Sequence, residues 1–176
     1  MEKNKIEIKL IGVTKLHVDA IVNAANSSLL AGGGVCGAIF SEAGYRELTE
    51  ACNKIGYCPT GSAVITPGFN LPSKYIIHAV GPEWNGGNNN EPQLLYSAYK
   101  NSLLIAKENN CHSIAFPLIS AGIYLYPVDK AWRKALQASL DFLNDNKDYD
   151  IDITFAVIDE SIKAIGEEIL KELTSK

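Results

Sequence analysis

The sequence predicts a three-layer α/β/α sandwich with a mixed, mainly parallel central sheet. Six short apolar segments alternate along the chain with longer segments in which apolar residues recur every three or four positions. Several of the short segments are apolar throughout, as parallel strands are when helices cover both faces of their sheet. Strands that alternate with helices in this way favour helices packed on both faces.

Each predicted strand is bounded by polar, glycine or proline residues. The strands span residues 6–11, 18–23, 62–67, 74–80, 113–118 and 151–158. The predicted helices span 35–49, 91–109, 127–144 and 161–173, and Pro127 suits the first turn of its helix. Residues 83–92, EWNGGNNNEP, are predicted to be a surface excursion and not a domain boundary. We therefore expect residues 1–176 to form a single domain.

Charge and composition exclude several classes of function. The formal net charge is −4, so a broad electrostatic grip on nucleic acid is not expected. The N-terminal segment lacks the apolar core of a signal peptide and no run is long enough to cross a membrane, which favours a cytosolic protein without a membrane partner. Cysteines and histidines show no metal-ligand spacing, so we expect reduced thiols and no metal.

Three consecutive glycines, Gly32 to Gly34, open the predicted helix over 35–49. Bare backbone at a helix N-terminus suits a phosphate, because free N–H groups and the positive end of the helix dipole point at it. A second small-residue loop, residues 120–124, follows another predicted strand, and the two loops together would clamp a diphosphate. The alternative is that the glycines only make tight turns.

The glycines also satisfy the pattern GxGxxG at Gly32, Gly34 and Gly37. In a dinucleotide fold such glycines follow the first strand at once, and an acidic residue closes a second strand about 20 residues on. Here eight residues separate Asn23 from Gly32, and no such strand follows. We therefore reject a nicotinamide cofactor and keep nucleotide binding.

Several polar side chains near these loops are candidates for a site. An asparagine amide both donates and accepts hydrogen bonds, which suits ribose hydroxyls. We interpret Asn23 as a structural support and Asn26 as the ligand contact. Cys36 lies near a helix N-terminus, where a thiol pKa is often lowered, but packing is the favoured interpretation because no base neighbours it in sequence. His78 is predicted to be a core residue.

The segments VDAIVNAAN, GGGVCGAIFSEAG, YIIHAVGP and FPLISAGIYLYP together resemble the macro domain family, which binds ADP-ribose and its derivatives. They span most of the chain in the family's order. The chain looks most like the bacterial stand-alone macro domains, a group that includes enzymes processing ADP-ribose-1''-phosphate and O-acetyl-ADP-ribose and hydrolases of ADP-ribosylated protein. The resemblance implies the same α/β/α sandwich, no cofactor, and ADP-ribose or ADP-ribosylated protein as the partner.

The resemblance also implies a role for individual residues. Asn26 would position the terminal ribose and a water, and is the one catalytic candidate. The diphosphate would be bound on one side by Gly33, Gly34, Val35 and Cys36 and on the other side by Ser120, Gly122, Ile123 and Tyr124. The adenine would be surrounded by Gly12, Val13 and Ile158. Tyr124 or Tyr126 is expected to be a wall of the ribose pocket.

The chain departs from the family's pattern at several positions. Gly12 replaces an aspartate that accepts from the adenine amino group, and Ile158 replaces a stacking aromatic. Cys36 and Phe40 replace the aspartate and histidine of the hydrolase branch. Leu125 replaces a glycine and is expected to crowd the site. Two functions stay open: a hydrolase of ADP-ribose derivatives, which we favour, and a non-catalytic module that recognises ADP-ribose.

Overall fold

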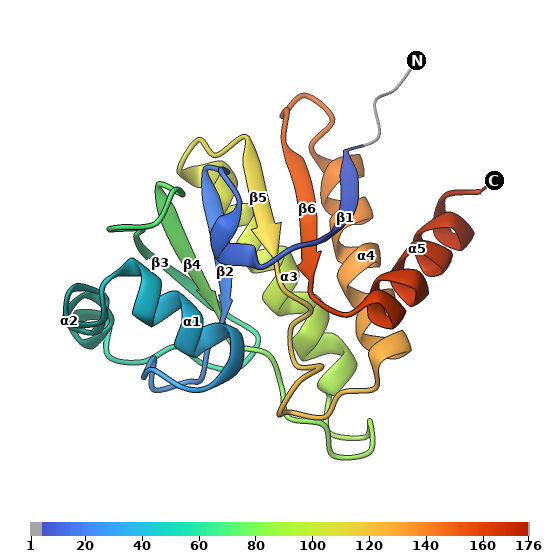
Figure 1. Cartoon of the computed structure of the whole chain (residues 1–176). Coiled ribbons are helices and arrows are strands. Elements are labelled where there is room, and N and C mark those ends of the chain that lie inside the picture. The colour runs from blue at the N-terminus through green and yellow to red at the C-terminus, as the bar shows by residue number, and fades with distance from the viewer. Residues whose placement is uncertain (1–4, 176) are drawn as a thin grey trace.

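The computed structural model describes residues 5–175, which form a central sheet between two layers of helices (Figure 1). Within these residues six strands lie in the order β1-β6-β5-β2-β4-β3. Their bounds are Ile6–Leu10 for β1, Ala20–Ala24 for β2, Ala63–Pro67 for β3, Tyr75–Ala79 for β4, Ser113–Phe116 for β5 and Asp152–Val157 for β6. Only β3 runs antiparallel to its neighbour, so the predicted mixed, mainly parallel sheet is confirmed.

In the described part of the chain, two helices cover one face of the sheet and three cover the other (Figure 1). The first pair is α1 (Gly34–Ala43) and α2 (Tyr45–Ile55). The second group is α3 (Glu91–Glu108), α4 (Val128–Asp145) and α5 (Glu160–Thr174), and a short 3-10 helix, η1 (Val13–Lys15), follows β1. No helix within residues 5–175 is both long enough and apolar enough to cross a membrane.

The single helix predicted over residues 35–49 is wrong, because the chain turns at Gly44 and begins a second helix. Gly44 has φ +119, which ends α1 and starts α2. A Cβ built at Gly44 would lie 2.8 Å from Oε1 of Glu47. Glycine reaches a positive φ without steric cost, so the break is encoded by one residue inside an otherwise helical pattern.

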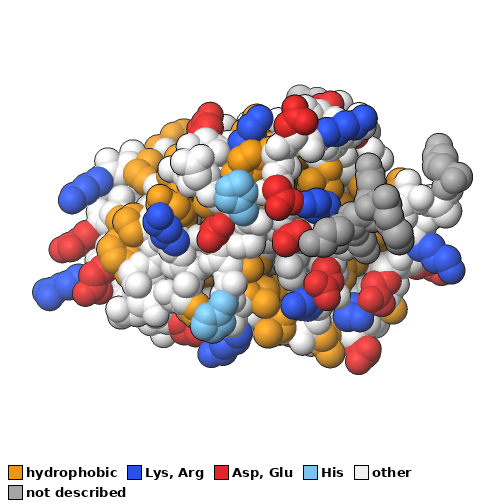
Figure 2. Space-filling model, turned by 90° about the horizontal axis from the view of Figure 1, so that it is seen from above, with side chains coloured by type: hydrophobic (Ala, Val, Ile, Leu, Met, Phe, Trp, Pro, Cys, Tyr) orange, Lys and Arg blue, Asp and Glu red, His pale blue; other side chains and the backbone are white. Residues whose placement is uncertain are grey.

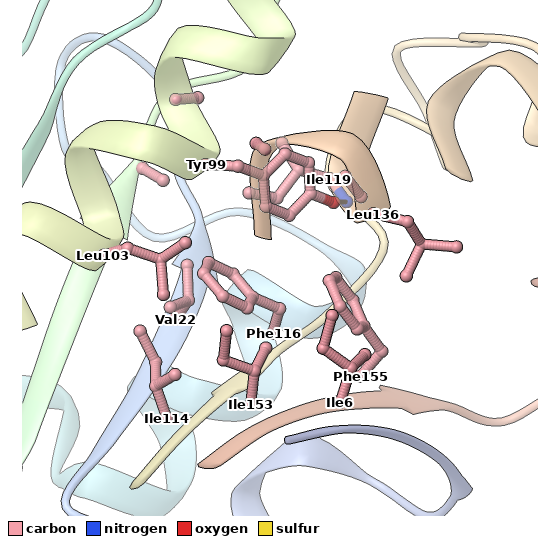
Figure 3. Packing of buried hydrophobic residues seen from close by; sticks show 14 of the residues in the cluster. Ile6, Val22, Tyr99, Leu103, Ile114, Phe116, Ile119, Leu136, Ile153 and Phe155 are labelled. Carbon is pink, nitrogen blue, oxygen red and sulfur yellow. Dashed lines mark hydrogen bonds between the residues drawn. The ribbon is translucent and has the colours of Figure 1, made fainter. Parts of the chain in front are cut away.

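The core has two parts, because successive side chains of each strand point to opposite faces of the sheet. Val22 and Ile77 belong to the part of the core on the side of α3, α4 and α5, whereas Ile21 and Ile76 belong to the part on the side of α1 and α2. Figure 3 shows the larger part, where the rings of Phe116 and Phe155 stack 5.4 Å apart. This packing fixes the parallel strands, whose carboxyl ends share the lower edge of the sheet in Figure 1.

A chain of buried hydrogen bonds joins β2, β4 and β3 through Asn23, His78 and Thr66. The Thr66 hydroxyl donates to Pro67 O, so it accepts from Nε2 of His78 at 3.0 Å. Nδ1 of His78 then accepts from the Asn23 amide at 3.0 Å. Burial lowers the pKa of His78 to about 4, so the ring is neutral. Asn23 and His78 are thus structural residues, as the sequence predicts.

Candidate functional site

A cleft of about 620 Å³ lies at the carboxyl ends of β2, β5 and β6. Its walls come from η1, from the loops that follow these strands, and from the first turn of α1. Open parallel sheets bind ligands at this edge. The cleft is lined by Gly12, Val13, Thr14, Ala24, Ala25, Asn26, Gly32, Gly33, Gly34, Val35, Cys36, Ala38, Gly81, Pro117, Leu118, Ile119, Ser120, Gly122, Ile123, Tyr124 and Ile158. Every residue that the resemblance assigns to the ligand is in this set, although contact with a ligand stays a prediction.

The glycine loop leaves open space in front of the N-terminus of α1. Gly33 caps the helix, and no acidic side chain occupies its first turn. A Cβ built at Gly33 or Gly34 would meet no atom within 4 Å, whereas one at Gly37 would lie 2.6 Å from Gly32 O. Gly37 therefore lets the loop fold close onto its helix. The first-turn N–H groups, which no helical carbonyl accepts, remain available to an anion.

The Asn26 side chain holds the loop between β2 and the glycines. Its Nδ2 donates to Leu30 O at 2.8 Å, and its Oδ1 accepts from Leu30 N at 3.0 Å. An amide has a second N–H and a second lone pair, so these two bonds leave one donor and one acceptor for a ligand. Asn26 thus supports the loop through hydrogen bonds, which is the kind of role that was predicted for Asn23. It also lines the cleft, as predicted for Asn26 itself.

The opposite wall is a tight loop that begins directly after β5. Ser120 has φ +69, and its carbonyl accepts from Tyr126 N at 2.9 Å to close the loop. The preceding residue is fixed from the core, since Ile119 N donates at 2.8 Å to the hydroxyl of the buried Tyr99 (Figure 3). Ser120 Oγ is buried and has no hydrogen-bond partner among the described residues. It faces Gly81, since a Cβ built there would lie 2.2 Å from it, and its burial leaves no surface of this oxygen for a ligand to reach.

The lining of the cleft carries no acidic, basic or histidine side chain. Its titratable groups are Cys36 and Tyr124, and burial raises the pKa of the Tyr124 phenol, which stays neutral at pH 7. The thiol of Cys36 is buried and lies 3.7 Å from Leu30 O. Within residues 5–175 no cluster of histidine, cysteine and carboxylate side chains could hold a metal ion. The cleft therefore offers neutral donors, chiefly backbone N–H groups.

Two expectations about neighbouring residues need correction or refinement. Leu125 does not crowd the cleft: it is 73% exposed and lies outside the described lining, because the loop turns there with φ +63. Of the two tyrosines, Tyr124 lines the cleft, whereas Tyr126 is buried against the Trp84 ring. Phe40, at the histidine position of the hydrolase branch, is a core residue.

Sequence reasoning missed Gly81, which follows β4 and lines the cleft. A Cβ built there would lie 2.2 Å from Ser120 Oγ, so only glycine lets the two segments approach this closely. The sequence HAVGP, in which a glycine follows an apolar strand, could have identified Gly81 as a residue of the cleft.

Comparison with known proteins agrees with this geometry. The family model described as Macro domain matches residues 22–135. The chain belongs to the macro domain family. Among similar relatives, a protein of Escherichia fergusonii named O-acetyl-ADP-ribose deacetylase is 52% identical over 145 residues, which cover 80% of this chain and 81% of the relative.

Solved structures of macro domains share the fold along most of the chain. A macrodomain of Oceanobacillus iheyensis solved with ADP is 42% identical, with a TM-score of 0.90 and coverage of 98% of this chain and 95% of that one. A macrodomain of Trypanosoma brucei in complex with ADP-ribose is 37% identical, with a TM-score of 0.88 and coverage of 94% and 69%. Macro domains that are similar to this one have therefore been solved with ADP or with ADP-ribose.

Proposed function

We propose that this protein binds ADP-ribose in the cleft and hydrolyses ADP-ribose derivatives. The observation that carries the proposal is the pair of facing loops that line the cleft: the glycine loop with the free first-turn N–H groups of α1, and the small-residue loop that contains Ser120 and Gly122. Such a pair suits a diphosphate, with the adenine toward Gly12 and Ile158 and the terminal ribose toward Asn26. Relatives that are named deacetylases or were solved with ADP-ribose support the same ligand class.

The substrate classes in this proposal are O-acetyl-ADP-ribose, ADP-ribose-1''-phosphate and mono-ADP-ribosylated protein. The cleft lacks a carboxylate or histidine to act as a base. We infer that a phosphate oxygen of the ligand accepts the proton of the attacking water, whose oxygen bonds to the acyl carbon, the phosphorus or the anomeric carbon. The bond from that atom to the ribose hydroxyl or to the protein side chain breaks, and the leaving group takes the proton back from the phosphate. The free donor and acceptor of Asn26 orient that water and the ribose, while backbone N–H groups stabilise the developing charge. We place this activity in the cytosol and assign the whole chain to one domain.

The lack of charged side chains in the cleft favours a second candidate function. A module that recognises ADP-ribose on a protein needs the same phosphate cradle but no base. Catalysis and recognition therefore differ only in whether bound ligand is turned over.

Binding and turnover should be measured on the same preparation. Calorimetry with ADP-ribose tests the cleft, and single-turnover assays with an ester, a phosphomonoester and a glycosidic substrate test the chemistry. We expect turnover to fall about a hundredfold in Asn26→Ala, because a small misplacement disrupts the geometry of attack, and to survive in Cys36→Ala. Because Asn26 also holds Leu30, folding and ADP-ribose affinity are measured for both variants.

The possible results separate the hypotheses. Binding without turnover on any of the three substrates would favour the recognition module. Loss of turnover in Cys36→Ala with intact binding would make the thiol a nucleophile. Absence of ADP-ribose binding in the wild type would contradict the proposed function itself.

A further inference from the structure

The segment that connects β4 to α3, residues 80–90, packs against the Ser120 loop and supports it; we call this segment the brace. Besides the close approach of Gly81 to Ser120, the backbone N–H of Trp84 donates to Tyr124 O at 2.9 Å. The Trp84 ring also packs on the Tyr126 ring, with centroids 4.7 Å apart. Residues 80–90 are therefore attached at three points to one wall of the cleft, and two of these contacts are made by Trp84, within the predicted surface excursion.

The same segment is organised around one buried carboxylate, that of Glu91. This residue is 1% exposed, although it stands at the first position of α3. One oxygen accepts from Asn85 N at 2.7 Å and from Gly87 N at 3.2 Å, and the other accepts from Asn89 N at 2.7 Å. Burial opposes the charge, but these backbone donors outweigh it and hold the pKa of Glu91 below its ordinary value. Glu91 therefore stays ionised at neutral pH and fixes three backbone groups at once.

Gly87 links the carboxylate to the Trp84 ring of the brace. Its backbone N–H binds Glu91, and a Cβ built on it would lie 2.8 Å from Cη2 of Trp84. The backbone held by Glu91 thus lies directly against the indole. A continuous set of contacts runs from the Glu91 carboxylate through Gly87 and Trp84 to Tyr124, which lines the cleft.

We propose that Glu91 is a positioning residue for the cleft: by organising residues 85–89 it holds Trp84, and through Trp84 it holds the Tyr124 side of the Ser120 loop in its ligand-ready shape. The inference rests on the proposed function only in so far as the ligand is ADP-ribose. Glu91 itself lies outside the described lining of the cleft, so it acts without touching the ligand.

The decisive variant is Glu91→Gln, which keeps the size of the side chain. The carboxylate oxygens accept hydrogen bonds from backbone N–H groups, and the amide nitrogen of glutamine, itself a donor, cannot accept them. The matched control is Asp19→Asn, because Asp19 Oδ2 also accepts a backbone N–H, that of His112 at 2.7 Å, but beside the amino end of β5. Gly87→Ala is a second test variant: its Cβ would meet the Trp84 ring and its φ of +88 adds backbone strain at the N–H that binds Glu91, while the carboxylate itself is kept.

The primary measurement is amide hydrogen exchange, which reads the Trp84 N–H directly. In Glu91→Gln we expect faster exchange at Trp84 as well as at Asn85, Gly87 and Asn89, with unchanged exchange in β2 and β4. ADP-ribose affinity should fall about tenfold, since a loop that must be ordered on binding costs affinity. Gly87→Ala should show the same two effects, and Asp19→Asn neither.

Unchanged exchange at Trp84 in a folded Glu91→Gln variant would overturn the proposal, whatever happens to binding. Faster exchange at Trp84 with wild-type affinity would also overturn it, because the brace would then not matter to the cleft. If the wild type does not bind ADP-ribose, the proposed function fails, while exchange at Trp84 still decides whether Glu91 holds the loop.

Discussion

At the scale of single residues, Gly34 is the position where a side chain would interfere most directly with an anion. Gly34→Glu adds a negative side chain to open space at the N-terminus of α1. We expect calorimetry to detect no ADP-ribose binding. Gly34 has φ +57, so the variant also carries about 1 kcal/mol or more of backbone strain. Gly56→Glu is the matched control: φ is +87 and the Cβ is similarly uncrowded, but it lies at the end of α2. Wild-type affinity in Gly34→Glu would place the anion elsewhere.

Gly12 and Ile158 leave the predicted adenine end without a carboxylate or an aromatic ring. Ile158 is 84% exposed and offers only an apolar surface. A hydrogen bond to a charged acceptor contributes about 1.5–3 kcal/mol, and no such acceptor lines this cleft. We therefore expect the inosine analogue of ADP-ribose to bind within about tenfold of ADP-ribose in competition calorimetry. A hundredfold preference for adenine would mean that another group, such as a backbone carbonyl, reads the amino group.

His78 should make the stability of the protein depend on pH below neutrality. The pKa of His78 is about 4 in the folded protein and 6.5 in the unfolded chain. Between pH 4 and pH 6.5 the unfolded chain therefore binds a proton at His78 and the folded protein does not. The free energy of unfolding should fall as the pH decreases through this window, by about 3 kcal/mol in all. Urea denaturation between pH 7 and 5 measures most of the loss before carboxylates titrate. His78→Gln cannot titrate, and an equal slope in that variant would assign the effect to another group.

At the scale of elements, α4 and α5 pack so closely that their contact depends on one glycine. A Cβ built at Gly166 would lie 2.5 Å from Cε2 of Trp132, a fully buried ring whose Nε1 donates to Ile162 O. Gly166→Ala should lower the free energy of unfolding by about 1–3 kcal/mol through overpacking, in spite of the better helix propensity of alanine. Denaturant titration measures it. In a Trp132→Phe background the same Gly166→Ala change should cost less than in the wild type; an equal cost in both backgrounds would contradict the steric cause.

The elements also show where sequence reasoning succeeds and where it fails. The strands were predictable because β2, β4 and β5 are buried on both faces and therefore read as short apolar runs between polar residues. The break between α1 and α2 was not, since Gly44 is a single residue within a continuous apolar pattern, and a glycine inside a helix pattern is ambiguous.

The candidate site divides in the same way. The glycine loop and the Ser120 loop were predictable because small residues follow apolar strands. The bracing of the second loop was not, because the role of Glu91 depends on backbone N–H groups of residues 85–89, which any sequence supplies. The exposed position of Leu125 depends on a positive φ, which a leucine in the sequence does not predict.

At the scale of the whole molecule, charge should work against the ligand at long range. The formal net charge is −4, and acidic and basic side chains are interspersed on the face seen in Figure 2, opposite the carboxyl ends of the parallel strands. A diphosphate held by lysine or arginine would lose affinity as salt rises, whereas here salt screens a weak repulsion. We expect ADP-ribose affinity to stay constant or rise by up to about threefold between roughly 20 and 200 mM salt. A pronounced fall in calorimetry would point to a cationic contact.

The pairing of β1 with β6 has a consequence for how the protein is made. Ile6 lies beside Ile153 in the finished sheet, although almost the whole chain separates them. During translation β1 is made long before β6, its neighbour in the described sheet. Such distant pairing is entropically costly and slow to form. The newly made chain therefore carries the apolar face of β1, which is buried in the finished core, uncovered until β6 has been made.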